Sequence, residues 1–244
     1  MPVFGVRAPP PPPPDTLHTG MQASYVAEGL PQAQQLKPLG LTHFQYVEGD
    51  RLGMLLALAS LAPVFLVVAE TTIVFSRREV AGVLLLAGQL LNEALSLALK
   101  EAVREERPHR HLGDGYGMPS SHAQFMGFFA LYVALYFERQ TGAHRVHRRI
   151  AQAGAAVLGA AVAVSRVYLG YHTLRQTLAG GAVGLAAAAA WYAFAECVLR
   201  PSGFVDAALA ARPCRWLLLR DSRNVPDVAL AEYTLSMAAK QKVA

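Results

Sequence analysis

Five apolar segments separated by short polar stretches dominate this sequence. They cover approximately residues 52–74, 80–99, 122–137, 150–164 and 177–199. The hydrocarbon core of a bilayer requires about 20 apolar residues per helix, and backbone groups inside it must find their hydrogen bonds within the helix. The segments therefore predict an all-α, polytopic membrane bundle with about five transmembrane helices.

The composition supports this class and excludes others. Hydrophobic residues make up 53% of the 244 residues and charged residues only 16%. The net charge of +5 is compatible with nucleic-acid binding, but the basic residues lie in short loops without the aromatic residues of a recognition surface. We therefore expect no nucleic-acid partner, and the sequence indicates no particular protein partner. Cys197 and Cys214 are expected to be unpaired thiols.

The chain divides into three parts by composition. Residues 1–40 contain six consecutive prolines, Pro9 to Pro14, and such a composition predicts a disordered N-terminus. Residues 41–200 contain the apolar segments and form the transmembrane domain. Residues 201–244 form a basic, partly apolar tail, in which residues 216–219 could lie at the membrane interface.

Three polar blocks stand where apolar segments end. They are Lys100-x6-Arg107-Pro108, Pro119-Ser120-Ser121-His122 and Ser165-Arg166-x5-His172. Charged residues beside a membrane segment are costly and usually functional. A lysine, two arginines, two histidines and several serines together form a set that can hold a phosphate group and cleave its bond.

The first block predicts a cationic clamp. Lys100 and Arg107 are seven residues apart, so a continuous helix would place them on one face. Arginine offers a two-pronged donor to phosphate oxygens and lysine a point charge. Arg104 shares this stripe, and we interpret it as an anchor at the membrane surface rather than as a ligand.

The other two blocks supply the candidate catalytic residues. Ser120 or Ser121 can cap the third helix, whose N-terminus attracts an anion, and His122 lies in the first turn. His172 and Gln176 are spaced to share a face of the fifth helix. Gln176 could therefore hold one imidazole nitrogen of His172 and leave the other free to attack.

The remaining histidines in the loops carry no such pattern. His109 and His111 flank the clamp without a Cys, Asp or Glu partner at metal-ligand spacing. His144 and His147 lie in a basic loop. We expect these four side chains to be solvated.

The distribution of positive charge predicts the orientation of the chain. The side that carries the three blocks holds nine Lys and Arg residues and the other side thirteen. Without the block residues Lys100, Arg107 and Arg166, the counts are six and thirteen. The tail and the 138–149 loop are therefore expected to be cytosolic, and the three blocks to face the opposite side together.

The three blocks resemble the signature of the type 2 phosphatidic acid phosphatase superfamily, K-x6-R-P, P-S-G-H and S-R-x5-H-x3-D. Ser121 replaces the glycine and Gln176 replaces the aspartate. Both replacements are similar to the branch that acts on dolichyl diphosphate, as are residues 117–126 and 165–173. The resemblance extends over roughly 80% of the chain and implies the helical core that this superfamily shares with haloperoxidases.

The resemblance also implies roles for the individual residues. His172 would be the nucleophile that forms a phosphohistidine, and His122 the general acid. The phosphoryl group would be bound by Lys100, Arg107, Ser120, Ser121 and Arg166. It implies no metal or other cofactor, since fixed cations supply the positive charge.

The implied reaction is hydrolysis of dolichyl diphosphate to dolichyl phosphate and inorganic phosphate. In a eukaryotic cell this places the protein in the endoplasmic reticulum membrane, with the site facing the lumen, where it would recycle the lipid carrier of N-glycosylation. Two alternatives stay open. One is a phosphatase for phosphatidate or sphingoid phosphates. The other is a non-catalytic protein that binds lipid phosphates.

Overall fold

Every apolar segment expected from the sequence is helical in the structure, a computed structural model. It describes residues 45–109, 112, 115–139, 145–225 and 228–243. The expected disordered N-terminus, residues 1–40, lies outside the described residues. The helices of the bundle are α2 (Arg51–Ala59), α3 (Ala62–Arg77), α4 (Val80–Val103), α5 (Ser121–Arg139), α6 (Arg145–Tyr168) and α7 (Leu174–Phe194). Three further helices follow in the tail: α8 (Phe204–Ala210), α9 (Arg212–Trp216) and α10 (Val228–Val243).

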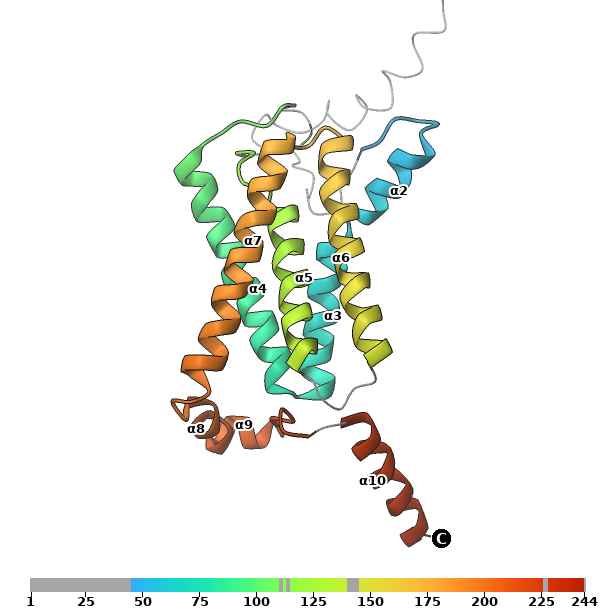
Figure 1. Ribbon diagram of the computed structural model, residues 1–244, viewed down its shortest axis with the longest axis vertical. Helices are drawn as coiled ribbons and strands as arrows, with labels where there is room; N and C mark the ends of the chain where they lie inside the picture. The colour runs from blue at the N-terminus through green and yellow to red at the C-terminus, as the bar shows by residue number, and fades with distance from the viewer. Residues whose placement is uncertain (1–44, 110–111, 113–114, 140–144, 226–227, 244) are drawn as a thin grey trace, which may run out of the picture. The chain divides into compact units, whose positions relative to one another are not determined.

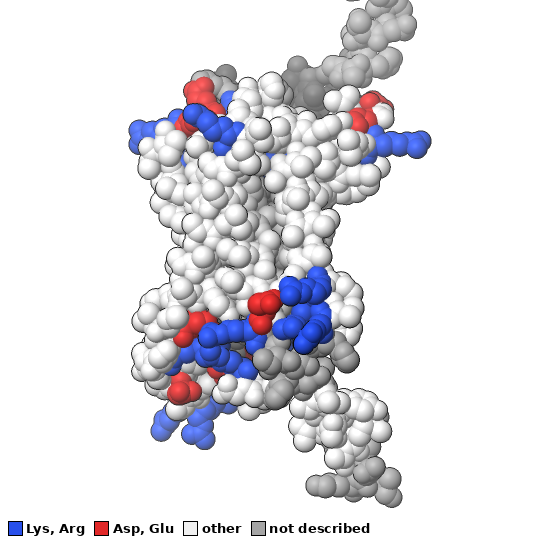
Figure 2. All heavy atoms as spheres, in the orientation of Figure 1, with Lys and Arg blue, Asp and Glu red and all other residues white. Residues whose placement is uncertain are grey.

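Four stretches in the described residues are long and apolar enough to cross a membrane: Arg51–Arg77, Val80–Val103, Arg145–Tyr168 and Leu174–Leu199. The last includes the π-helical turn Ala195–Leu199 that continues α7. The remaining expected segment, residues 122–137, forms α5, which lies among the other helices (Figure 1). Charged side chains gather at the two ends of the bundle, and a band almost without charge separates them on the face shown (Figure 2). This pattern agrees with a helical membrane protein.

The first apolar segment is interrupted just before Pro63. Helix α2 ends at Ala59, and α3 begins at Ala62 with Pro63 in its first turn. Proline lacks an N–H and is best accommodated where a helix starts. The break places Ser60 inside the bundle with its side chain fully buried, and its Oγ lies 2.7 Å from the Oγ of Ser165 on α6.

Helix α5 is the centre of the packing. It contacts α7 most extensively, then α6, and also α3 and α4. Small residues on α7 permit the close approach to α5. A Cβ added at Gly184 would lie 2.0 Å from the carbonyl oxygen of Gln124, and one at Gly180 would lie 2.4 Å from that of Ser120.

Gly184→Ala should therefore destabilise the bundle. The two helices must separate to admit the methyl group, and overpacking of this kind typically costs about 1–3 kcal/mol. Gly154→Ala on α6 is the matched control, because its Cβ would meet nothing within 4 Å. Thermal unfolding of the purified proteins in detergent should show a lower midpoint for Gly184→Ala alone. Equal midpoints for the two variants would contradict this packing.

The tail is attached to the end of the bundle opposite α2 (Figure 1). Arg220 lies 2.7 Å from the carboxylate of Glu79, which also accepts a hydrogen bond from Ser222 at 2.7 Å. Trp216 is 83% exposed. Its exposure is compatible with the interfacial position expected from the sequence. Cys197 and Cys214 are both free thiols, as expected.

Candidate active site

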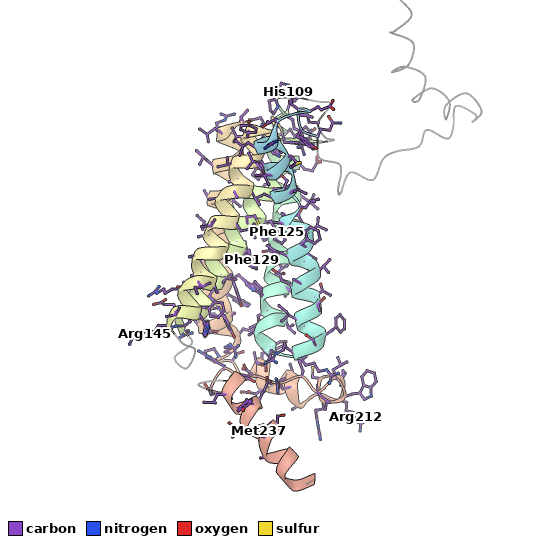
Figure 3. The ribbon with its side chains drawn as sticks, turned by 90° about the vertical axis from the view of Figure 1, so that its right-hand side faces the viewer. His109, Phe125, Phe129, Arg145, Arg212 and Met237 are labelled. Carbon is purple, nitrogen blue, oxygen red and sulfur yellow. The ribbon has the colours of Figure 1, made fainter. Side chains whose placement is uncertain are left out.

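The three polar blocks come together at one end of the bundle. The C-terminal ends of α4 and α6 and the N-terminal ends of α5 and α7 meet there (Figure 1). His109, next to the first block, lies at this end, whereas Arg145 and Arg212 lie at the other (Figure 3). The prediction that all three blocks share one side of the bundle is confirmed.

His172 lies in the connection between α6 and α7, and it is 3% exposed. Its backbone N–H donates to the carbonyl of Arg166 at 3.0 Å. The sequence placed His172 on a face of the following helix, but α7 begins at Leu174 with Thr173 as its N-cap. Thr173 and Gln176 form a capping box, in which side chains satisfy the first free N–H groups of the helix.

The hydrogen bonds around His172 define which nitrogen carries the proton. Its Nδ1 lies 3.3 Å from Oε1 of Gln176, and its Nε2 lies 3.3 Å from Nη1 of Arg107. Arginine can only donate, so Nε2 must accept and Nδ1 must hold the hydrogen. The ring therefore presents an unprotonated Nε2 to the cationic side of the site.

Arg107 reaches His172 by a route that the helical spacing did not predict. Helix α4 ends at Val103, and Arg104 has the left-handed backbone φ of 52°. The chain turns out of the helix before Arg107, so the expectation that Lys100 and Arg107 share one helical face was wrong. Pro108 follows Arg107, and proline disfavours helix in the residue before it. Arg104 is exposed, and its Nε donates to the carbonyl of Glu101 at 3.0 Å, which is compatible with its interpretation as an anchor.

Arg166 is the most enclosed cation of the site, with 2% of its surface exposed. Its Nη1 donates to Ser60 at 3.2 Å, and its guanidinium carbon lies 4.1 Å from the ring centre of Tyr171. Ser60 was not among the residues predicted from the sequence. In the sequence, Ser60 stands out only as a hydroxyl residue three positions before Pro63 in an apolar segment.

The second block forms the start of α5. Helix α5 begins at Ser121, whose Oγ accepts a hydrogen bond from Ser96 of α4 at 3.0 Å. The backbone N–H of Ser120 donates to the carbonyl of Gln176 at 3.1 Å, which joins this block to α7. The Oγ of Ser120 is buried without a hydrogen-bond partner in the described part of the chain. A phosphate oxygen would satisfy it.

Burial and the positive charges of the site together keep His172 neutral. Burial is the main cause that lowers the pKa of His172 to about 3. The positive charges of Arg107, Arg166 and Lys100 lower this pKa further, and the hydrogen bond to Gln176 acts in the opposite direction. The positive charges of Arg166, Lys100 and Arg107 also act on His122, so the two histidines belong to one site.

Two other described histidines lie outside this cluster. His109 and His147 are exposed, as expected, while His111 and His144 lie outside the described residues. No group of three or more His, Cys, Asp or Glu side chains in the described part of the chain could hold a metal ion.

The chain is similar to known proteins over most of its length. The model of the PAP2 superfamily matches residues 81–198. Dolichyldiphosphatase 1 of Homo sapiens is 39% identical over 214 residues, which cover 83% of this chain and 89% of that protein. Lipid phosphate phosphatase gamma of Arabidopsis thaliana is 36% identical and covers 85% of this chain and 94% of that protein.

A solved structure shows the same fold. The transmembrane PAP2-type phosphatidylglycerolphosphate phosphatase from Bacillus subtilis aligns with a TM-score of 0.53 and 22% identity, covering 62% of this chain and 80% of that one. The fold and the match to the superfamily define a membrane phosphatase of the PAP2 type. Within that superfamily, the chain belongs to the dolichyldiphosphatase family.

Proposed function

We propose that this protein hydrolyses dolichyl diphosphate to dolichyl phosphate and inorganic phosphate. The observation that carries the proposal is the position of His172, whose unprotonated Nε2 lies beside Arg107 in a buried cationic site. The identity to dolichyldiphosphatases over most of the chain supports the choice of substrate.

The proposed reaction has two steps. Nε2 of His172 attacks the terminal phosphorus, and the bond from this phosphorus to the bridging oxygen breaks. Dolichyl phosphate leaves, with His122 as the proton donor. Water then cleaves the phosphohistidine, His122 takes the proton from that water, and inorganic phosphate is released. A positioned acid and base of this kind contributes typically 10²–10⁴-fold.

The remaining site residues hold the phosphoryl group. Transfer spreads negative charge over its three outer oxygens. Lys100, Arg107 and Arg166 surround His172 closely enough for their charges to act on it. Ser120 and Ser121 would add donors at the start of α5, and Gln176 would orient His172.

An apolar groove supports a lipid substrate with a long tail. Its volume is about 340 Å³, and side chains of α4, α5 and α7 line it, including Leu91, Leu95 and Trp191. Asn92, a polar residue of its lining, bonds to Gln124. One turn further along α4, Ser96 bonds to Ser121 of the site. A tail in this groove would lead from the lipid to the phosphate site.

A panel of lipid phosphates tests the choice of substrate. The purified protein should release phosphate from dolichyl diphosphate with a higher kcat/KM than from phosphatidate, sphingoid phosphate or diacylglycerol pyrophosphate. A preference for phosphatidate would favour the alternative represented by the Arabidopsis relative, a lipid phosphate phosphatase. Binding of every lipid without phosphate release would favour the non-catalytic alternative.

We also propose that the site faces the lumen of the endoplasmic reticulum. The excess of Lys and Arg on the opposite side of the bundle supports this orientation. A single cysteine introduced at exposed Arg104, in a variant with Cys197 and Cys214 replaced, should react with a membrane-impermeant reagent only after microsomes are opened. Reaction in sealed microsomes would place the site in the cytosol.

The charge of Arg107 should control the acid side of the pH profile. At low pH a protonated ring cannot attack, and the positive charge of Arg107 helps to keep the pKa of His172 near 3. Removing this charge in Arg107→Gln should raise that pKa, so the ratio of variant to wild-type kcat/KM should fall as the pH decreases from 7 to 4. Ionisation of the substrate cancels in this ratio. Arg104→Gln is the control, and a pH-independent ratio for Arg107→Gln would contradict the assignment.

A further inference from the structure

The amide of Gln176 is held in one orientation. It stands where the PAP2 signature has aspartate, so an uncharged group supports the proposed nucleophile. Its Oε1 faces Nδ1 of His172 at 3.3 Å and accepts from the N–H of Thr173 at 3.2 Å. Its Nε2 donates to Oε1 of Glu105 at 2.9 Å and to the carbonyl of Glu106 at 2.8 Å. A flipped amide would turn its oxygen toward two acceptors.

Glu105 thus places a carboxylate one amide away from His172. Its side chain is 27% exposed and also pairs with Arg175, whereas Gln176 is only 1% exposed. The Glu105 backbone carbonyl accepts from the N–H of Gly117 at 2.6 Å. A Cβ added at Gly117 would lie 2.7 Å from Nε2 of Gln176. The backbone at Gly117 therefore lies directly against the amide of Gln176, and the absence of a side chain at Gly117 leaves the space that this amide needs.

We propose that Glu105 is a positioning residue that replaces the usual aspartate indirectly. Its negative charge polarises the amide of Gln176 through the hydrogen bond, and the polarised Oε1 then holds the Nδ1–H of His172. Hydrogen bonds in such a chain strengthen one another in a buried site. This series of hydrogen bonds favours the tautomer with an unprotonated Nε2 and stabilises the positive charge that the ring gains during attack. This inference rests on the proposed role of His172 as the nucleophile.

The first test removes the carboxylate. Glu105→Ala should lower kcat for dolichyl diphosphate about 10–100-fold, the loss that typically follows removal of the group that orients a functional histidine in metal sites. KM should change little, because Glu105 is not proposed to contact the substrate. Arg175→Ala is the matched control: it breaks the same ion pair but leaves the hydrogen bond between Glu105 and Gln176. It should retain wild-type kcat.

Two further variants separate positioning from folding. Gly117→Ala pushes on the amide of Gln176 and keeps the carboxylate of Glu105, and it should cause a similar loss of kcat. In Gln176→Asp a carboxylate contacts His172 directly, so adding Glu105→Ala to that variant should cost little. It can even raise kcat by removing the repulsion between two carboxylates.

Three results would overturn the inference: wild-type kcat in Glu105→Ala, an equal loss in Arg175→Ala, or the same loss from Glu105→Ala in both backgrounds. All three results compare a variant with the wild type, so they can be obtained only if the wild-type protein is active. A wild-type protein that releases no phosphate from any lipid would instead contradict the proposed function itself.

Discussion

His172→Ala is expected to abolish phosphate release from dolichyl diphosphate. The variant lacks the atom that attacks phosphorus, and loss of a nucleophile typically costs several orders of magnitude in kcat, up to about 10⁶-fold. Phosphate release by the purified protein measures the effect. An acid-quenched reaction should also show no phosphorylated protein, whereas the wild type should show a transient one.

His147→Ala is the matched control for this prediction. His147 is an exposed histidine of α6, and Arg145 near it lies at the end of the bundle away from the site (Figure 3). This variant should retain wild-type activity. Binding of dolichyl diphosphate should survive in His172→Ala, because the cations remain. Residual turnover near the wild-type level would show that another residue is the nucleophile.

Arg166→Ala is expected to have the second-largest effect. Removing one donor that stabilises developing charge in a buried site typically lowers kcat by about 10²–10³-fold. The change also leaves Ser60 without its cationic donor and removes the cation from the ring of Tyr171. The unfolding temperature should therefore fall together with kcat.

Arg166→Lys separates these two effects. It keeps the charge but not the planar fork of donors, so kcat should recover partly. Arg104→Ala, an exposed arginine at the same end, should leave both kcat and stability unchanged. Loss of stability in Arg166→Ala with unchanged kcat would reduce Arg166 to a structural role.

The helices of the bundle and the site residues could be predicted from the sequence to a large extent. The apolar segments locate the membrane helices because each must satisfy its own backbone. The three blocks contain both histidines and the three cations that the structure brings together. Their common side also follows, since successive spanning helices must alternate in direction. The helices, the three blocks and their common side depend on short segments of the chain, so the residue pattern within each segment predicts them.

Other features depend on contacts between distant segments. Ser60 reaches Ser165 and Arg166 across more than 100 residues of sequence, and only the packing of α2 against α6 brings them together. The same holds for Glu105 and Gln176, which are 71 residues apart. Helical spacing was also misleading for Arg107, because α4 ends before it.

The sequence alone therefore determined the class of protein, the helices and the list of reactive side chains. Tertiary structure decided how these side chains are oriented. It determines which nitrogen of His172 is unprotonated, how the amide of Gln176 is turned, and that the carboxylate of Glu105 bonds to this amide. Residue types and spacing record the periodicity of one helix, but a hydrogen bond between two helices depends on their relative position. That position is set by close packing, here by the glycines of α7 against α5.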